Sequence, residues 1–317
     1  MATLSIITVH YHDEERLLSL LRSLPSHLAA IEAEVVVIDN GSSDGFARRV
    51  LDVAPDARYE RNATNRGFAA AVNQGVRLSR GEFVCILNPD VTLESPFFAP
   101  LLERLRADAA VAAVGPAVFR PDGRRQRTAH KRFPTLGTVF FEYCLPLQVA
   151  VSRWLGWLHP HDESDAAHGR SHRTAHLTGV CLLVRRGEFL TSGGFDEQFF
   201  FSLEETDWQR GLPATGKAVW YCAESRCKHY GSIGKRFAQG SPHFLRGLFR
   251  YWQKWYGREQ LRPLRAVIGA ASLVSLITLV PLSLLAIVRP HHGPKVRAFF
   301  AGYVEAFRWV FKQDPTA

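Results

Sequence analysis

The chain has 317 residues, of which 46% are hydrophobic and 22% are charged, and its net charge is +9. This composition excludes an intrinsically disordered protein and allows one large α/β domain or two smaller domains. A basic chain indicates an anionic partner. Much of the excess charge follows residue 225, where Arg and Lys alternate with Trp, Tyr and Phe. That mixture suits the headgroup region of a membrane at least as well as a nucleic-acid groove, and we predict a membrane surface and no nucleic acid as partner.

The first 40 residues have the pattern of a strand, a helix and a second strand. Residues 3–9 (TLSIITV) and 34–38 (EVVVI) are short β-branched runs, and DEERLLSLLRSLPSHL between them has apolar residues at helical spacing. Short connections of this kind form a right-handed βαβ unit and hence a parallel sheet. Because the N-terminus has no basic segment and becomes charged within thirteen residues, we expect a first strand there and not a signal peptide.

The alternation of strands and helices continues to residue 119. Residues 58–61 are a candidate third strand, and Asn65 is the expected N-cap of a helix through FAAAVNQGVRLS. A strand at 82–88 (EFVCILN), a helix over about 96–107 and a strand at 111–119 (VAAVGPAVF) follow. This order predicts a sheet with helices on its faces.

Two of the predicted strands end in carboxylates. Pro89 has no N–H for a sheet ladder, so the strand before it stops there and Asp90 lies at the carboxyl edge of the sheet. The second strand ends in Asp39 and is followed by a polar turn from Asn40 to Asp44. Ligands of open α/β sheets bind at this edge, so we expect a ligand site there. Each segment taken alone also fits an ordinary turn or helix cap.

The region from about 120 to 175 breaks the alternation. It opens with the basic segment PDGRRQRTAHKRF, and five His residues lie within 159–176 without a regular spacing. This composition predicts a mobile polar loop more readily than a metal site. We interpret the region as an insertion in the first domain, and HLTGVCLLVRR (176–186) as a strand that follows it.

The C-terminal region contains a long apolar segment. Residues 266–288 carry no charge over 23 positions, which is long enough to span a hydrocarbon core of roughly 30 Å. Basic residues flank both ends, so their distribution gives no orientation. The segment that follows, KVRAFFAGYVEAFRWVFK, has an aromatic stripe at helical spacing, as interfacial helices have. We predict a membrane-associating helical region at 241–317, with a buried helical hairpin as the alternative.

The segment TNRGFAAAVNQG has the residues of a phosphate contact. Gly67 lets the backbone approach a ligand, Arg66 offers a cation, and Asn73 lies on the following helix. The segment fits neither the dinucleotide fingerprint GxGxxG nor the phosphate-loop pattern that ends in Gly-Lys-Ser/Thr. These mismatches disfavour an NAD site and a simple P-loop.

The segment GGFDEQFFFSLEETDW carries three acids close together. If it is helical, Glu204 and Asp207 share a face and Glu205 points about 100° away from them. A Phe-lined setting raises the pKa of a carboxyl group toward the range of a general base. A solvated acidic helix start is the alternative.

Seven motifs follow one another along the chain: LSIITVHYH, VVVIDNGSSDG, NRGFAAAVNQG, LNPDV, TGVCLLVRR, GGFDEQFFFSLEETDW and KHYGS. In this order and spacing the chain resembles the family 2 glycosyltransferases over about residues 3–235, in particular their bacterial rhamnosyltransferase-like branch. The resemblance implies the nucleotide-binding α/β fold called GT-A, with a mostly parallel central sheet flanked by helices. We place that domain at 1–240 and a C-terminal hydrophobic helical extension at 241–317.

The resemblance also implies the roles of individual residues. Asp39 and Asp44 would hold the nucleoside of the donor, and the other predicted donor-binding residues are Thr8, His10, Asn40, Asn65, Arg66, Gly67, Asn73 and Asn88. Asp90 would hold a divalent cation, Mg²⁺ or Mn²⁺, as the last acid of the family's Asp-x-Asp signature, and His229 would complete the site.

The chain departs from the family pattern at two positions. The first acid of Asp-x-Asp is Asn88, so the cation would rest on one carboxylate and His229. The usual Glu-Asp-x-Asp is here Glu204-Glu205-Thr206-Asp207, with Glu where the family has its base. We predict Glu205 as the base, with Glu204 and Asp207 as supports of the acceptor or its loop.

The resemblance implies an inverting glycosyltransferase with a nucleoside diphosphate sugar as donor, and L-rhamnose from dTDP-rhamnose as the leading candidate. The acceptor would be a hydroxyl of a glycan or a polyprenyl-diphosphate-linked saccharide in cell-surface polysaccharide assembly. The protein would act at the cytoplasmic face of the bacterial plasma membrane, as a peripheral or single-span protein, with a homodimer left open. The alternatives are a transferase for another nucleotide hexose, a nucleotidyltransferase, and a non-catalytic membrane-anchored scaffold suggested by Asn88 and Glu205.

Overall fold

The protein is represented by a computed structural model that describes residues 3–28, 31–42, 45–94, 96–154, 161–231, 241–288 and 293–311. The chain forms two compact units. The first comprises Met1–Phe133, Asp165–Phe200 and Glu204–Gly231, and the second comprises Pro134–Ser164, Phe201–Leu203 and Ser232–Ala317. Residues 134–164, predicted as part of an insertion in the first domain, therefore group with the C-terminal helices.

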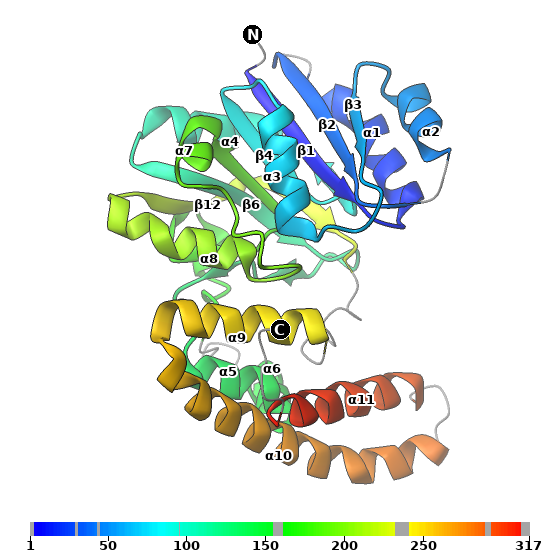
Figure 1. The fold of residues 1–317 in the computed structure, drawn as a ribbon, viewed down its shortest axis with the longest axis vertical. Helices are drawn as coiled ribbons and strands as arrows, with labels where there is room; N and C mark the ends of the chain where they lie inside the picture. Colours follow the sequence, from blue (N-terminus) through cyan, green and yellow to red (C-terminus); the bar gives the residue numbers. More distant parts are fainter. Residues whose placement is uncertain are drawn as a thin grey trace. The chain divides into compact units, whose positions relative to one another are not determined.

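The first unit alternates strands and helices along the chain (Figure 1). Its strands are β1 (Leu4–His10), β2 (Ala33–Asp39), β3 (Arg58–Arg61), β4 (Phe83–Leu87), β5 (Val91–Glu94), β6 (Val111–Phe119), β7 (Arg125–Gln126), β8 (Ala129–His130), β9 (His172–Thr174), β10 (His176–Leu177), β11 (Cys181–Arg185) and β12 (Ala218–His229). Its α-helices are α1 (Glu14–Leu28), α2 (Phe46–Val53), α3 (Phe68–Leu78), α4 (Phe98–Ala107), α7 (Arg186–Thr191) and α8 (Glu204–Gly211).

One mixed sheet forms the centre of this unit, with strand order β3-β2-β1-β4-β11-β6-β12-β5. Strands β3, β2, β1 and β4 are parallel, as the βαβ pattern predicts. β11 runs antiparallel to both of its neighbours, β4 and β6, and β12 runs parallel to β6. The carboxyl ends of β1, β2, β4, β6 and β12 and the amino end of β11 therefore lie at one edge of the sheet.

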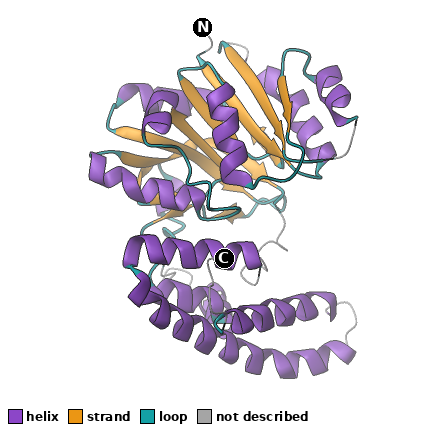
Figure 2. Cartoon of the chain, viewed as in Figure 1, coloured by secondary structure: helices purple, strands orange, loops and turns teal. Residues whose placement is uncertain are grey.

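Helices cover both faces of the sheet (Figure 2). On one face the leucines of α1, together with α2 and α4, pack against alternate strand residues such as Ile6, Val37 and Cys85. On the other face α3, α7 and α8 pack against the intervening residues, such as Ile7 and Val36. Because strand side chains alternate between faces, strands covered on both sides consist almost entirely of apolar residues, as in β4 (FVCIL).

β12 contains an irregularity that affects the end of the strand. Its pairing with β6 shifts between Cys222 and Arg226, so that residues 223–225 bulge out of the ladder. Ser225 is fully buried in this bulge, and its hydroxyl donates to the carbonyl of Phe97 at 2.8 Å. After the bulge the strand continues to His229, which pairs with Val91 of β5.

Two local expectations from the sequence are wrong. The N-cap of α3 is Gly67 and not Asn65, because the Asn65 side chain instead accepts hydrogen bonds from the Gly67 amide and from Asn40. The segment 176–186 is two strands, β10 and β11, and not one. Its backbone leaves the ladder at Gly179, whose amide donates to the Glu205 carboxylate at 3.2 Å.

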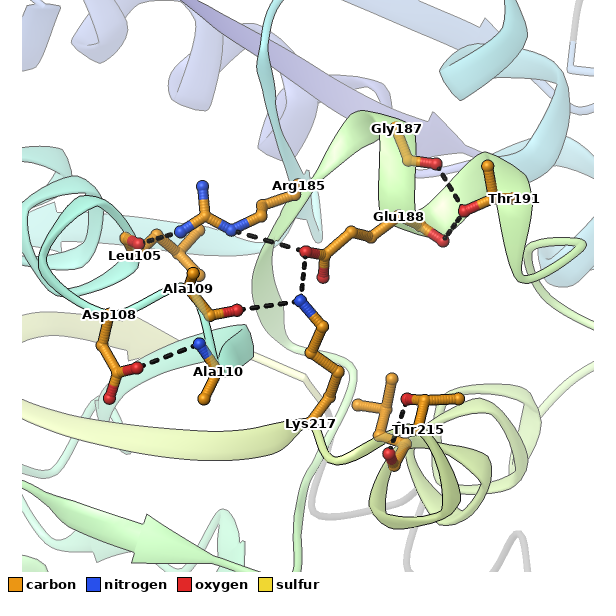
Figure 3. A network of polar contacts seen from close by, with 11 residues as sticks. Leu105, Asp108, Ala109, Ala110, Arg185, Gly187, Glu188, Thr191, Thr215 and Lys217 are labelled. Atoms are coloured by element: carbon orange, nitrogen blue, oxygen red, sulfur yellow. Dashed lines mark hydrogen bonds and ion pairs between the residues drawn. The ribbon is translucent and has the colours of Figure 1, made fainter.

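A network of charged residues lies at the edge of the sheet opposite the strand ends described above (Figure 3). Glu188 of α7 accepts from Lys217 at 2.6 Å and lies 3.8 Å from the Arg185 guanidinium. Lys217 also donates to the Ala109 carbonyl at 2.8 Å, and Arg185 donates to the carbonyl of Leu105. These contacts join the ends of β11 and α4 to the residue before β12.

The second unit is helical. Its described elements are α5 (Leu136–Tyr143), α6 (Leu145–Trp154), α9 (Pro242–Tyr256), α10 (Leu261–Val288) and α11 (Gly293–Trp309). α10 and α11 lie side by side (Figure 1). Ser275 of α10 joins α10 to α5 and α6, because its hydroxyl donates to Tyr143 O at 2.7 Å and accepts from Leu145 N at 2.8 Å.

We predict that Gly67→Ala destabilises the first unit strongly. Gly67 has a φ of +87°, and a Cβ there would lie 2.6 Å from the Phe200 carbonyl oxygen. Backbone strain and the clash together predict a loss of about 2–4 kcal/mol in the free energy of unfolding, measurable by urea denaturation. Gly123→Ala is the matched control, because Gly123 has a φ of +80° with nothing within 4 Å of a built Cβ. Equal losses for both variants would show that the contact with Phe200 is not tight.

Candidate active site

The carboxyl edge of the sheet gathers the polar side chains of the first unit. Asp39 ends β2, Asp90 follows β4, and His229 ends β12. Glu205 lies in the first turn of α8 and reaches the same edge through Gly179, just before β11. Asp39 is separated from β4 by two strand spacings, about 10 Å, which a nucleoside diphosphate can bridge.

Asp39 is fully buried and already oriented. Its Oδ1 accepts from the Ser42 amide at 2.8 Å, and its Oδ2 accepts from the Tyr59 hydroxyl. Arg61 Nε lies 4.0 Å from Oδ2. Burial and the hydrogen bond to Asp39 raise the pKa of Tyr59, so Tyr59 remains a protonated donor at neutral pH. Tyr59 is a residue that the sequence analysis missed, because nothing local to RYER indicates a partner in β2.

Asn40 holds the loop before α3. Its Nδ2 donates to Asn65 Oδ1 at 2.7 Å and to the Gly67 carbonyl at 3.1 Å. Its Oδ1 accepts from Asn62 Nδ2 and from the Arg66 amide, both at 3.1 Å. In this arrangement Asn40 and Asn65 shape the loop, whereas the Arg66 side chain is exposed beside the start of α3.

Thr8 and His10 lie on the same face of β1 as Asp39 does on β2, and both are fully buried. Thr8 Oγ1 and both ring nitrogens of His10 have no hydrogen-bond partner among the described residues. Burial lowers the pKa of His10, and the negative charge of Asp39 opposes this only in part, so the ring is neutral at pH 7. Their role in donor binding remains a prediction.

Asn73 braces a loop that precedes α8. Its Nδ2 donates to the Phe195 carbonyl at 2.7 Å and to Glu197 at 3.1 Å, and its Oδ1 accepts from the Phe195 amide at 2.9 Å. Gly194 is required beside it, because a Cβ there would lie 2.5 Å from Asn73 Oδ1. Asn73 is thus positioned to hold the loop, and its donor contact also remains a prediction.

Asp90 and His229 face one another. Asp90 Oδ1 lies 3.3 Å from His229 Nε2, and each side chain is only about an eighth exposed, at 13% and 12%. On the other side of the ring, His229 Nδ1 lies 3.1 Å from Gln126 Oε1 of β7. An amide oxygen accepts only, so the bond to Gln126 places a proton on Nδ1. Gln126 was missed in the sequence, because it lies in a segment interpreted as a polar insertion.

These residues fit a divalent cation. With Nδ1 bonded to Gln126, the Nε2 atom of His229 faces a carboxylate oxygen, an arrangement that needs a proton or a cation between the two atoms. Carboxylate oxygen is the ligand that Mg²⁺ and Mn²⁺ prefer, and imidazole nitrogen suits a transition-metal ion such as Mn²⁺ better than Mg²⁺. Two neighbouring ligand atoms of an octahedral ion lie about 3 Å apart, close to the observed separation. Asn88 lies nearby, and its backbone amide donates to the Val180 carbonyl at 3.0 Å.

Glu205 is a partly buried carboxylate with a backbone donor. Burial raises its pKa, while the amides of Glu205, Gly179 and Thr206 and the nearby His130 act in the opposite direction. Gly179 is closely packed here, because a Cβ would lie 3.4 Å from the Glu205 carboxyl carbon. A carboxylate with a raised pKa accepts a proton more readily than an exposed glutamate does, as a general base requires.

Glu204 is buried more deeply, at 4% exposure, and its Oε2 has no hydrogen-bond partner among the described residues. Burial raises its pKa well above the usual range, and the neighbouring charge of Glu205 raises it further. We conclude that Glu204 holds its proton and that Glu205 ionises first. Asp207 is also buried, at 3% exposure, on the face of α8 that it shares with Glu204.

The backbone before α8 is strained. Ser202 and Leu203 have φ values of +74° and +73°, which non-glycine residues rarely adopt, and His12 at the end of β1 has a φ of +56°. Strain of this kind persists where the surrounding structure over-determines it, and it concentrates at functional sites.

Asp44 lies outside the described residues, and its predicted role in nucleoside binding stays a prediction.

Comparison with known proteins identifies the family. Residues 5–189 match the family described as Glycosyl transferase family 2. The chain belongs to this family. It is 29% identical over 234 residues to N-acetylglucosaminyl-diphospho-decaprenol L-rhamnosyltransferase of Mycobacterium tuberculosis, an alignment that covers 68% of this chain and 71% of that protein.

Two solved structures are similar in fold. The mannosyltransferase PcManGT from Pyrobaculum calidifontis, in complex with GDP-Man and Mn²⁺, matches with a TM-score of 0.56 and 17% identity, covering 98% of this chain and 88% of that chain. GalNAc-T7 with UDP, GalNAc and Mn²⁺ matches with a TM-score of 0.62 and 14% identity, covering 83% of this chain and 49% of that chain. The predicted GT-A fold, with a helical C-terminal extension, is confirmed.

We predict that Glu204→Gln is more stable than the wild type above pH 4.3 and equally stable below it. The folded state raises the pKa of Glu204 above its unfolded value of about 4.3, so the folded protein binds more protons in that window and loses stability as pH rises. The difference should grow by up to about 1.4 kcal/mol per pH unit until the raised pKa is reached. Urea denaturation across pH 4 to 8 measures it, with the exposed Glu103→Gln on α4 as control. A pH-independent difference would contradict the buried, protonated state.

Proposed function

We propose that this family 2 glycosyltransferase transfers a sugar, L-rhamnose from dTDP-rhamnose, to a hydroxyl of a lipid-linked saccharide acceptor, with inversion at the sugar carbon. The proposal rests on the placement of Glu205, a partly buried carboxylate, at the sheet edge that also holds the Asp90–His229 pair. The choice of rhamnose and of a lipid-linked acceptor is supported by the mycobacterial relative, an L-rhamnosyltransferase named for a decaprenol-linked substrate.

The donor would lie along the carboxyl edge, with its nucleoside toward Asp39 and its diphosphate toward Asp90. Asp90 and His229 would hold a divalent cation, which neutralises the negative charge of the diphosphate. Tyr59 and the Ser42 amide fix the Asp39 carboxylate, so that this acceptor of hydrogen bonds is oriented before the donor arrives. Arg66 offers a cation beside the start of α3.

The displacement would occur in one step. The Glu205 carboxylate accepts the proton of the acceptor hydroxyl as its oxygen bonds to the sugar carbon, and the bond from that carbon to the diphosphate oxygen breaks. The nucleoside diphosphate leaves on the opposite side of the sugar, so configuration inverts. Glu204, which keeps its proton, adds no second negative charge beside the base.

The second unit would dock on an anionic membrane surface, where a lipid-linked acceptor resides. Residues 232–317 contain 13 Lys and Arg but 3 Asp and Glu, so this region carries an excess of 10 positive charges, compared with a net charge of +9 for the whole chain. Among the described residues, Arg258–Val280 is long and apolar enough to cross a membrane by length and composition, a property it shares with core helices of soluble proteins. On α10, Leu273, Val274, Ile277 and Val280 are 41% to 64% exposed. An exposed apolar stripe beside basic residues suits interfacial binding.

We predict that Glu205→Gln loses most sugar transfer but still binds the donor. The substitution keeps the shape and removes the proton acceptor, so kcat should fall by about 10² to 10⁴. Release of nucleoside diphosphate measures turnover, and calorimetry with dTDP-rhamnose and Mn²⁺ measures binding. Asp90→Ala is the matched variant, because it should lose both donor binding and transfer. Normal turnover of Glu205→Gln would exclude it as the base, and tighter binding of another nucleotide sugar would exclude rhamnose.

We predict that Ile277→Glu weakens binding to liposomes that contain anionic lipid. Ile277 is 64% exposed on α10, and a carboxylate there opposes insertion into the headgroup region. Leu51→Glu on α2, where Leu51 is 41% exposed, adds the same charge to the first unit and should leave binding unchanged. Co-flotation with vesicles measures the difference. Equal binding of both variants would show that the α10 stripe is not the docking surface.

A further inference from the structure

A single buried amide joins α8 to the strand that precedes Gly179. Gln209 is fully buried. Its Oε1 accepts from the Leu177 amide at 2.9 Å, and its Nε2 donates to the Leu177 carbonyl at 2.8 Å. The same Nε2 donates to the Glu205 carbonyl at 2.9 Å. Both polar groups of Leu177 in β10 are therefore held by one side chain on α8.

This contact fixes the backbone that receives the Glu205 carboxylate. Leu177 lies two residues before Gly179, whose amide donates to Glu205 Oε1. Between them, the Thr178 amide donates to the Thr128 carbonyl at 3.0 Å, so the segment 177–179 is tied at each residue. Gln209 connects this segment to the backbone of Glu205 itself.

We propose that Gln209 is a positioning residue for sugar transfer: it holds the Gly179 amide against the carboxylate of Glu205 and so fixes the direction in which that carboxylate points. The inference rests on the proposed role of Glu205 as base. Gln209 itself is fully buried, so it would act on the reaction through Glu205.

The arrangement has a chemical reason. A carboxylate that accepts one hydrogen bond from a fixed backbone amide keeps one oxygen occupied and leaves the other for the acceptor hydroxyl. If the segment 177–179 moves, Glu205 loses its donor, and its charged form is less stabilised. The rate of sugar transfer then falls because the Glu205 carboxylate is misaligned, and a higher pH is needed to ionise it.

The test compares Gln209→Met with Ser192→Ala. Met matches Gln in length and lacks its hydrogen bonds. Ser192→Ala removes a hydrogen bond from the same helix on another side, because Trp208 Nε1 donates to Ser192 Oγ at 2.8 Å. Gln209→Met should lower kcat by about 10- to 100-fold with the donor KM within about twofold of the wild type. The acidic limb of the kcat–pH profile of this variant should shift to higher pH by about one unit. Ser192→Ala should lower the melting temperature without changing kcat or the pH profile.

The outcomes separate this inference from the proposed function. If Glu205→Gln abolishes transfer while Gln209→Met keeps the wild-type kcat and pH profile, the inference is overturned and the proposed function stands. If Glu205→Gln retains turnover, the base assignment and this inference fall together. If Gln209→Met does not fold, Gln209→Asn, which shortens the amide by one methylene, is measured in its place. A shift of the acidic limb in the same direction supports the inference, and an unmoved limb overturns it.

Discussion

The hydrogen bond from Asn88 N to Val180 O, at the end of the antiparallel β4–β11 ladder, joins the two halves of the candidate active site. Parallel strands deliver Asp39 and Asp90 to their carboxyl edge, but α8 follows β11 in the chain. Because β11 runs the opposite way, its amino end meets that edge, and Gly179 offers its amide to Glu205 there. The reversed strand therefore brings the acids of the second half of the chain beside those of the first.

Desolvation sets the chemistry of this edge. Two adjacent glutamates, one buried and one partly buried, lie at the start of one short helix, and desolvation raises the pKa of both. They differ in their surroundings, because backbone amides stabilise charge on Glu205 while Glu204 Oε2 has no hydrogen-bond partner in the part of the chain that the structure describes. Desolvation is the larger effect on both glutamates, and the hydrogen bonds to Glu205 oppose it.

Much of the fold is readable in the sequence because the information is local. β-Branched runs and apolar spacing place β1, α1, β2, α3 and β4 within a few residues of their observed ends. The errors arise where a partner distant in sequence decides. Asn65 gives its side chain to Asn40, and Gly179 leaves the ladder for Glu205. Tyr59 and Gln126 were missed for the same reason: each is recognised as part of the site only through its contact with Asp39 or His229.

The bulge at residues 223–225 separates two requirements on β12. The first half of the strand must keep register with β6 to fill the core, whereas the end must present His229 on the face toward Asp90. Since successive strand residues point to opposite faces, a deletion of one residue after the bulge would turn the imidazole away from its carboxylate. Insertions or deletions within the bulge itself do not change which face of the sheet each of the final four residues points to. Natural variation in the length of this strand should therefore be confined to the loop around Ser225, with the interval from Arg226 to His229 held constant.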